Sequence, residues 1–136
     1  MKITPEKITK LKPNEIFVFG SNINGIHGAG AARLAKLKFG AVWGCGRGWM
    51  GQTYAVPTRE FTQGKGFETF DIDEIEEEIV SLEGFIMLNP DKEFLITKIG
   101  CGLAGLKIDQ VAPLFESISK LPNVSLPKEF WDIINN

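Results

Sequence analysis

The chain has 136 residues, of which 43% are hydrophobic and 24% charged, and its formal net charge is −2. This length fits one domain over residues 1–136, and the composition is that of an ordinary globular protein, which excludes disorder and a membrane-spanning class. Lysine and arginine form no long basic run, which disfavours nucleic-acid binding through phosphate neutralisation. No apolar stretch approaches the roughly 20 residues needed to cross a bilayer, and the first residues lack the apolar centre of a signal peptide, so we expect a cytoplasmic protein.

The chain has few residues that bind metals. It contains two cysteines, Cys45 and Cys101, and a single histidine, His27. These are too few for a closed structural zinc site, so we expect no metal and no resident cofactor. In a cytoplasmic chain the two thiols are expected to be reduced.

The first predicted elements are a strand and a helix joined by a glycine-rich loop. Residues 15–20, "EIFVFG", are apolar, β-branched and aromatic after a Pro-Asn turn signal, which is typical of a buried strand. From Ala29 onward, small and apolar residues recur at helical spacing until Gly40, which can cap the helix.

The middle of the chain predicts two short strands and a loop. Apolar residues favour strands at 41–43 and 53–56, and the glycines between them indicate a turn or bulge. Residues 59–70 have mixed charge and no clear period, which predicts a surface loop, a candidate lid or rim.

A long amphipathic helix is predicted next, with Asp71 or Asp73 as its N-cap. Its apolar stripe has the spacing of one helical face: Ile72, Ile75, Ile79, Leu82 and Ile86. The glutamates between them are interpreted as the solvated face and not as a metal site.

The last third predicts a buried strand at 93–100, followed by "CGLAG". A helix is expected next, with Asp109 as N-cap and Ile108, Val111, Phe115 and Ile118 on its apolar face. A short strand at 124–126 and an aromatic tail with Phe130 and Trp131 follow. Strands alternating with helices indicate an α/β domain, whose ligands usually bind beyond the carboxyl ends of the strands.

Both glycine clusters follow predicted strands. Small residues let backbone N–H groups approach a ligand closely, and a helix start favours negative charge, so the two loops together could hold a diphosphate. Each cluster could also serve tight turns alone. "GAGAA" imitates the dinucleotide fingerprint, but Arg33 stands at its sixth place and no acidic residue follows about 20 positions on. The hypothesis of a nicotinamide-dependent oxidoreductase is therefore supported by that imperfect pattern alone.

Individual side chains suggest further roles. The carboxamide of Asn22, just past the first strand, can donate to and accept from a ribose hydroxyl. His27 could act as an acid or base, or make an incidental polar contact. Cys101 is interpreted as a small buried cysteine and not as a nucleophile. Four aromatic residues could stack on a base or fill the core, with the core favoured for all but Trp49: Trp43, Trp49, Tyr54 and Phe61.

Two segments together resemble the macrodomain family, the ADP-ribose-binding α/β/α fold. "KITKLKPNEIFVFGSN" is similar to that family's opening strand, and "IHGAGAARLA" to its glycine-rich loop and helix, with Asn22 where the family has its distal-ribose asparagine. "LITKIGCGLAGLKIDQVAPLF" resembles the second phosphate loop, most closely in the branch of the terminal ADP-ribose protein glycohydrolase.

The resemblance implies a three-layer α/β/α fold with a mixed sheet and a pocket for ADP-ribose or a related nucleotide. It implies that Asn22 orients the distal ribose, so we expect a catalytic role for Asn22. His27 is the second candidate catalytic residue, because of its acid–base chemistry and not because of the resemblance. The ligand-binding residues that it implies are Gly20, Ser21, Asn22, Gly28, Ala29, Gly30, Ala31, Ile99, Gly100, Cys101, Gly102, Leu103, Ala104 and Gly105.

The sequence departs from the family in two places. The family often has an aspartate that contacts the adenine amine directly before Ile-Thr, where this chain has Lys7. The glycohydrolase branch has an acidic residue after Gly-Cys-Gly-Leu and a lysine in its central loop, where this chain has Ala104 and, nearby, Thr58 and Arg59. That lysine and acid mechanism is therefore not expected here.

Two functions remain open. The first is hydrolysis of an ADP-ribosyl linkage, on a modified macromolecule or in a related metabolite, in which Asn22 would orient the distal ribose and His27 or Glu60 would activate water. The alternative is a module that binds ADP-ribose or a related nucleotide without turnover.

Overall fold

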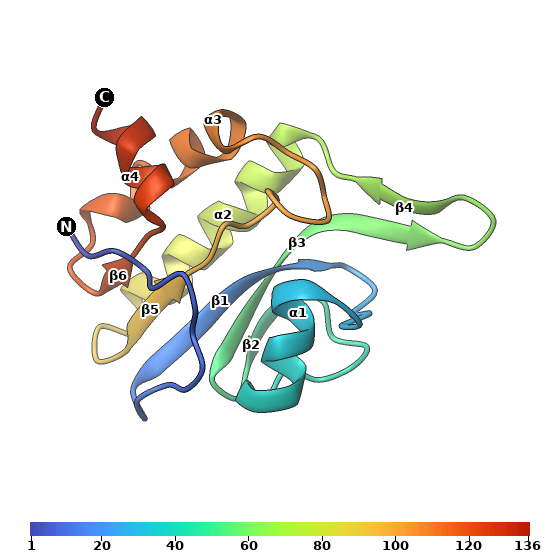
Figure 1. Cartoon of the computed structure of the whole chain (residues 1–136), viewed down its shortest axis with the longest axis horizontal. Helices are drawn as coiled ribbons and strands as arrows, with labels where there is room; N and C mark the ends of the chain where they lie inside the picture. Colours follow the sequence, from blue (N-terminus) through green and yellow to red (C-terminus); the bar gives the residue numbers. More distant parts are fainter.

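The central strand β1 (Glu15–Asn22) sends alternate side chains into two separate hydrophobic cores. Ile16 and Val18 belong to the larger core of 19 buried residues, whereas Phe17 and Phe19 belong to a smaller core of 8. Because successive strand residues point to opposite faces, each face of the sheet must be covered. The computed structural model, which describes residues 1–136, shows helices on both faces of the sheet, and this is the expected α/β fold (Figure 1).

The sheet is mixed. Its order is β2-β3-β1-β5-β6, and β4 pairs with β3 beyond the end of β1. β1 runs parallel to both β3 (Thr53–Thr62) and β5 (Glu93–Ile96), and β5 runs parallel to β6 (Val124–Ser125). β2 (Gly48–Met50) and β4 (Gly66–Thr69) are antiparallel to β3. The carboxyl ends of β1, β3 and β5 therefore meet at one edge.

The first helix covers the smaller core. α1 (Gly30–Leu34) continues without a break into a π-helical turn at Ala35–Phe39. Gly40 ends it with φ of 95°, a left-handed conformation that glycine adopts without strain, which confirms the predicted cap.

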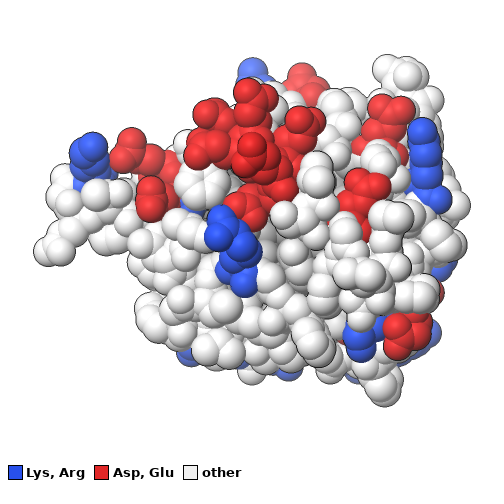
Figure 2. All heavy atoms as spheres, turned by 180° about the vertical axis from the view of Figure 1, so that it is seen from behind, with Lys and Arg blue, Asp and Glu red and all other residues white.

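The second helix, α2 (Ile72–Met87), covers the larger core. Asp71 caps it and not Asp73, and Glu74 completes a capping box by accepting from the Asp71 backbone N–H. Four members of the predicted stripe are buried: Ile75, Ile79, Leu82 and Ile86. Acidic side chains gather on the face of the molecule seen from behind (Figure 2). One of the helix glutamates, Glu78, is half-buried and pairs with Arg47.

The C-terminal third is less regular than predicted. α3 is only Ile108–Val111, and two 3₁₀ turns follow, at Ala112–Phe115 and Ile118–Lys120. Its N-cap is Lys107, so the prediction of Asp109 is wrong; Asp109 lies in the first turn instead. The aromatic tail forms α4 (Lys128–Ile134), which buries Phe130 and Trp131.

Two further predictions are wrong. Residues 41–43 form no strand; the short strand of this region is β2. Residues 59–70 are not a loop, because β3 continues to Thr62 and turns back as β4, which makes a hairpin that projects from the sheet (Figure 1). The other predicted strands are confirmed, although β5 ends at Ile96 and not at residue 100.

No helix combines the length and apolar character needed to span a membrane. The structure also brings together no group of three or more His, Cys, Asp or Glu side chains that could hold a metal ion.

Candidate functional site

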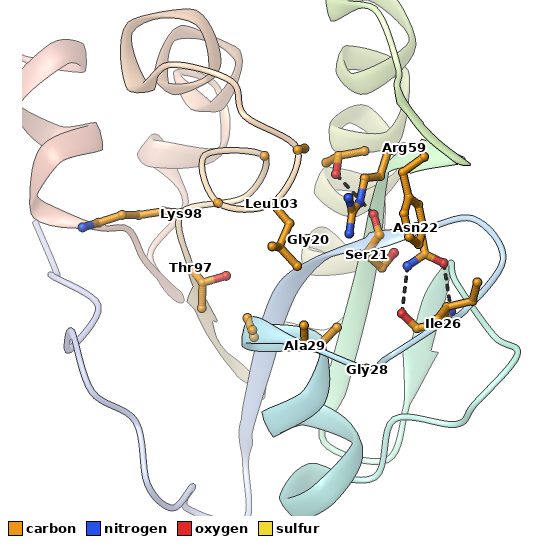
Figure 3. Close-up of a pocket in the computed structure, with 18 residues that line it drawn as sticks. Gly20, Ser21, Asn22, Ile26, Gly28, Ala29, Arg59, Thr97, Lys98 and Leu103 are labelled. Atoms are coloured by element: carbon orange, nitrogen blue, oxygen red, sulfur yellow. Dashed lines mark hydrogen bonds between the residues drawn. The ribbon is translucent and has the colours of Figure 1, made fainter. Parts of the chain in front are cut away.

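A cavity of about 320 Å³ lies at the carboxyl ends of β1, β3 and β5 (Figure 3). Three segments wall it: the end of β1 with the glycine-rich loop and the start of α1, the hairpin of β3 and β4, and the loop after β5. The last residues of neighbouring parallel strands meet here, which is where α/β folds usually bind ligands.

Most of the ligand residues implied by the sequence line this cavity. They are Gly20, Ser21, Asn22, Gly28, Ala29, Gly30, Ala31, Gly100, Gly102, Leu103 and Ala104. Ile99, Cys101 and Gly105 are not among the lining residues. Ile99 belongs to the larger core and Cys101 packs against it, while Gly105 takes a φ of 77° in the turn that follows.

Asn22 is buried, and its carboxamide holds the loop that it begins. Its Nδ2 donates to the Ile26 carbonyl and its Oδ1 accepts from the Ile26 N–H, both at 2.8 Å. One N–H and one oxygen lone pair of the amide remain for a ligand. Asn22 therefore shapes the loop as well as lining the cavity.

His27 belongs to the same loop but does not line the cavity. The ring is 1% exposed, its Nε2 lies 2.8 Å from the Cys45 carbonyl oxygen, and it meets Phe19 edge to face. Because a carbonyl only accepts, Nε2 holds the proton, and the buried Nδ1 is left without a partner. Phe19 and Cys45, which these two contacts involve, do not line the cavity.

Backbone N–H groups without a protein acceptor surround the cavity. In the first loop they belong to residues 28–32, and in the second to Gly100, Gly102, Leu103 and Ala104. Unpaired N–H groups on two converging loops are suited to bind the oxygens of an anion.

Two glycines of this cavity have no structural reason to be glycine. At ten of the glycines φ is positive, and at Gly20 and Gly46 an added Cβ would lie against neighbouring atoms. Only Gly28, Gly84 and Gly102 have neither property, since an added Cβ would meet nothing within 4 Å. Gly84 lies in α2, but Gly28 and Gly102 line opposite loops of the cavity. Their missing side chains leave room for a ligand.

Thr58 and Arg59 are expected near the site but without a role, and Phe67 and Thr97 line the cavity without having been predicted. Arg59 pairs in register with Asn22 across β1 and β3, and its guanidinium lies 3.9 Å from the centre of the Phe67 ring. Burial lowers the pKa of the Arg59 guanidinium. The signal that could have found Arg59 is the strand register, which requires β3 to extend past Pro57.

The threonines hold the strand ends in place. The Thr58 hydroxyl donates to the Ser21 carbonyl, and the Thr97 hydroxyl donates to the Val18 carbonyl at 2.8 Å. These bonds join β1 to β3 and β5 at the floor of the cavity.

A second cavity of about 510 Å³ adjoins the first, because Gly30, Ala31, Thr97 and Lys98 line both. Its apolar lining includes Ile8, Phe17 and Leu34. Lys98 pairs with Glu129, which raises the pKa of Lys98 and lowers that of Glu129. Glu6 lines this cavity, whereas Lys7 does not.

None of the four aromatic residues considered in the sequence lines the first cavity. Tyr54 is buried in the larger core as expected, but Trp43 is 56% exposed, so its assignment to the core is wrong. Phe61 is 37% exposed and packs against the Phe67 ring, so it is not a core residue either. Trp49 packs beside Phe85 and donates to the Gly51 carbonyl.

Comparison with known proteins identifies a fold and no activity. No family model matches the chain, and no curated protein matches it. A solved structure of a protein of unknown function from Bacteroides thetaiotaomicron matches with a TM-score of 0.61 and 16% sequence identity. The match covers 87% of this chain and 89% of that one. At this identity the likeness shows the α/β fold alone.

Proposed function

We propose that the protein binds ADP-ribose or a related NAD-derived nucleotide, with the diphosphate between the two glycine-containing loops. The observation that carries the proposal is the pair Gly28 and Gly102. Both line the cavity, and neither needs to be glycine for its backbone angle or its packing. A ligand that approaches the backbone closely at these two positions would explain why both residues are glycine.

The charges of the cavity support an anionic ligand. Its only charged lining residues are Arg59 and Lys98, and no Asp, Glu or His lines it. Lys98 is paired with Glu129, so the cation without a carboxylate partner is Arg59, and together with the unpaired N–H groups it favours an anionic ligand.

The adjoining cavity is suited to the nucleoside. Its apolar residues offer a surface on which a base can lie, and the shared residues Thr97 and Lys98 join it to the diphosphate end. The resemblance to macrodomains implies the same order of ligand parts. Glu6, not Lys7, is the charged residue of the opening segment available to the base.

Hydrolysis of an ADP-ribosyl linkage is the less supported part of the proposal. His27 is buried away from the cavity, and Glu60 is exposed on β3 and does not line it. With no carboxylate or imidazole in the lining, no residue is placed to activate water. Binding without turnover is the form of the function that the geometry supports best.

The binding test is isothermal titration of the purified protein with ADP-ribose. Gly102→Ala places a methyl group in the cavity without backbone strain, and we expect it to weaken binding at least about tenfold. Gly84→Ala is the matched control, because it adds the same methyl group in equally open space on α2. Wild-type protein that does not bind ADP-ribose, or equal affinity in Gly102→Ala and wild type, would contradict the proposal.

Turnover is tested separately with a protein automodified by ADP-ribose. Release of ADP-ribose above a buffer control, lost in Gly102→Ala, would establish hydrolysis in this cavity. Binding without release would establish the non-catalytic module, with ADP-ribosylated macromolecules as its partners.

A further inference from the structure

Positive and negative charges are segregated along the chain. Residues 1–56 contain eight lysines and arginines but only two acidic residues, Glu6 and Glu15. Residues 57–136 contain seven lysines and arginines and 15 acidic residues. The fold keeps these charges apart, because α1 and the acidic α2 cover opposite faces of the sheet (Figure 1), and Figure 2 shows the acidic face. The small net charge of −2 is therefore compatible with a strongly basic surface elsewhere on the molecule.

Two segments bring cations together around the last turn of the first helix. Ile8 and Leu34 both pack against the smaller core and both line the second cavity, so the opening segment lies along α1. The Gln52 side chain donates to the Lys12 carbonyl, and the Gln52 N–H donates to the Phe39 carbonyl, which places Lys12 near the end of the helix. The exposed cations of these two segments are Lys7, Lys10, Lys12, Arg33, Lys36 and Lys38.

None of these six cations forms an ion pair. The four ion pairs of the structure involve other cations, which are Lys2, Arg47, Lys98 and Lys128. Of the two acidic residues within residues 1–56, Glu15 accepts from the Lys12 backbone N–H, and Glu6 lines the second cavity. The six charges are therefore available to an external anion, and in physiological salt they act over about 8 Å.

Three large apolar side chains are exposed at the same place: Leu37, at 60%, and Val42 and Trp43, both at 56%. Leu37 belongs to the last turn of the helix, and Val42 and Trp43 follow soon after its Gly40 cap. The Lys36 Nζ lies 5.9 Å from the centre of the Trp43 ring, so cations and apolar side chains share one surface. We call the six cations and these three apolar side chains the basic end. Scattered apolar side chains are ordinary, but a group of them among cations is typical of an interaction site.

The basic end lies away from the first cavity. The helix begins at Gly30, in the lining of that cavity, and its π-helical turn ends where the Phe39 carbonyl accepts from the Gln52 N–H, directly before β3. The cavity lies at the carboxyl end of β3, whereas the basic end lies beside the start of that strand. A large partner at the basic end therefore leaves this cavity open.

We propose that the basic end binds the surface of a membrane that contains anionic lipids. The six cations lie against the charged lipid headgroups. Leu37, Val42 and Trp43 enter the headgroup region, where an indole ring suits the boundary between water and acyl chains. Single-stranded nucleic acid also attracts cations, but its phosphates would leave Leu37 and Val42 in water. The inference does not depend on the nucleotide proposed for the cavity.

The experiment is sedimentation of the full chain with vesicles of phosphatidylcholine and phosphatidylserine, and with vesicles of phosphatidylcholine alone. We expect at least about tenfold tighter binding to the anionic vesicles, and weaker binding as salt is raised. Lys36→Gln combined with Lys38→Gln should lower this affinity at least about tenfold. Lys65→Gln combined with Lys120→Gln is the matched control, because it removes two exposed, unpaired lysines from the acidic part of the chain and should change the affinity less than about twofold.

The apolar contribution is tested separately with Leu37→Ser combined with Trp43→Ser, which keeps all six cations. We expect this variant to lose at least about fivefold in affinity for the anionic vesicles, because less apolar surface leaves water. Met87→Ser combined with Leu88→Ser is its matched control, since these side chains are 64% and 82% exposed at the end of α2. Thermal unfolding of each variant shows that the fold is retained.

Three outcomes would overturn the inference. One is wild-type protein that binds the two kinds of vesicle equally, or binds neither. Another is a loss of affinity in the Lys36 and Lys38 variant that is no larger than in its control. The third is binding to oligouridylate that is tighter than binding to anionic vesicles and unchanged in the Leu37 and Trp43 variant, which would assign the basic end to nucleic acid.

Discussion

Asn22 joins the end of β1 to the glycine-rich loop through its two hydrogen bonds with Ile26. Removing the carboxamide leaves the Ile26 N–H and carbonyl without their partner. We expect Asn22→Ala to lower the free energy of unfolding by about 1 to 3 kcal/mol, the usual effect of unpairing such groups. Urea denaturation measures this, and amide exchange at Ile26 reports the loop directly.

Asn22→Asp is the informative companion. It keeps an acceptor for the Ile26 N–H but sets an oxygen against the Ile26 carbonyl, so it should also destabilise the loop. If Ile26 exchanges at the wild-type rate in Asn22→Ala, the loop does not depend on these bonds. If Ile26 exchanges faster in Asn22→Ala, the loop has changed, and a loss of ligand binding in that variant does not prove that Asn22 contacts the ligand.

Cys101 follows Gly100 in the second loop but packs against the larger core. Burial raises the pKa of its thiol, and the nearby Lys98 offsets this only in part. A raised pKa means less thiolate at neutral pH, so iodoacetamide should label Cys101 slowly at pH 7 and faster as pH rises. Mass spectrometry of the Cys101 peptide, with urea-unfolded protein as reference, follows the rate; folded protein labelled as fast as unfolded would contradict this.

At the scale of single elements, α2 contains a glycine that lowers the stability of the helix. Gly84 lies within its last turn and has open space around it. Alanine there restricts the unfolded chain and favours the helix, so Gly84→Ala should raise the free energy of unfolding by about 0.5 to 1 kcal/mol. Urea denaturation is the measurement, and a destabilised variant would show that Gly84 has a role in packing.

The strands show what the sequence could and could not predict. β1 was predicted from its apolar run and α2 from its stripe and cap, because each signal is local. The prediction for β3 stops at Val56, where the apolar run ends, and the next residue, Pro57, lacks the N–H that a strand usually needs. Pro57 is tolerated where the register of β1 and β3 shifts, between Ser21 and Asn22, and no sequence pattern shows that shift.

The candidate site, like the strands, could be predicted from the sequence only where the signal is local. The glycine loops could be predicted, because both follow convincing strands. Phe67 could not, and Arg59 could be placed near the site but given no role, because both line the cavity through the β3–β4 hairpin, which the sequence pattern does not indicate. Gly25 and Gly46 illustrate the opposite case: their added Cβ atoms would collide with backbone atoms, so these glycines serve packing and not a ligand.

At the scale of the whole molecule, the last helix completes the larger core. Phe130 is fully buried, and its ring lies 5.5 Å from that of Phe115. Phe130→Ala should lower the free energy of unfolding by about 3 to 5 kcal/mol, a large share of the typical total of about 5 to 15. Thermal and urea unfolding measure it, and a loss below about 1 kcal/mol would mean that α4 adds little to the core.

Both ends of the chain meet beside the second cavity. The Trp131 indole donates to the Lys2 carbonyl at 2.7 Å, and Ile3 bridges to Leu126. Ile3 to Glu6 and Pro127 to Glu129 supply much of that cavity's wall. A purification tag placed ahead of Met1 is therefore tethered a few residues from the surface proposed for the nucleoside, and affinities should be compared before and after the tag is removed.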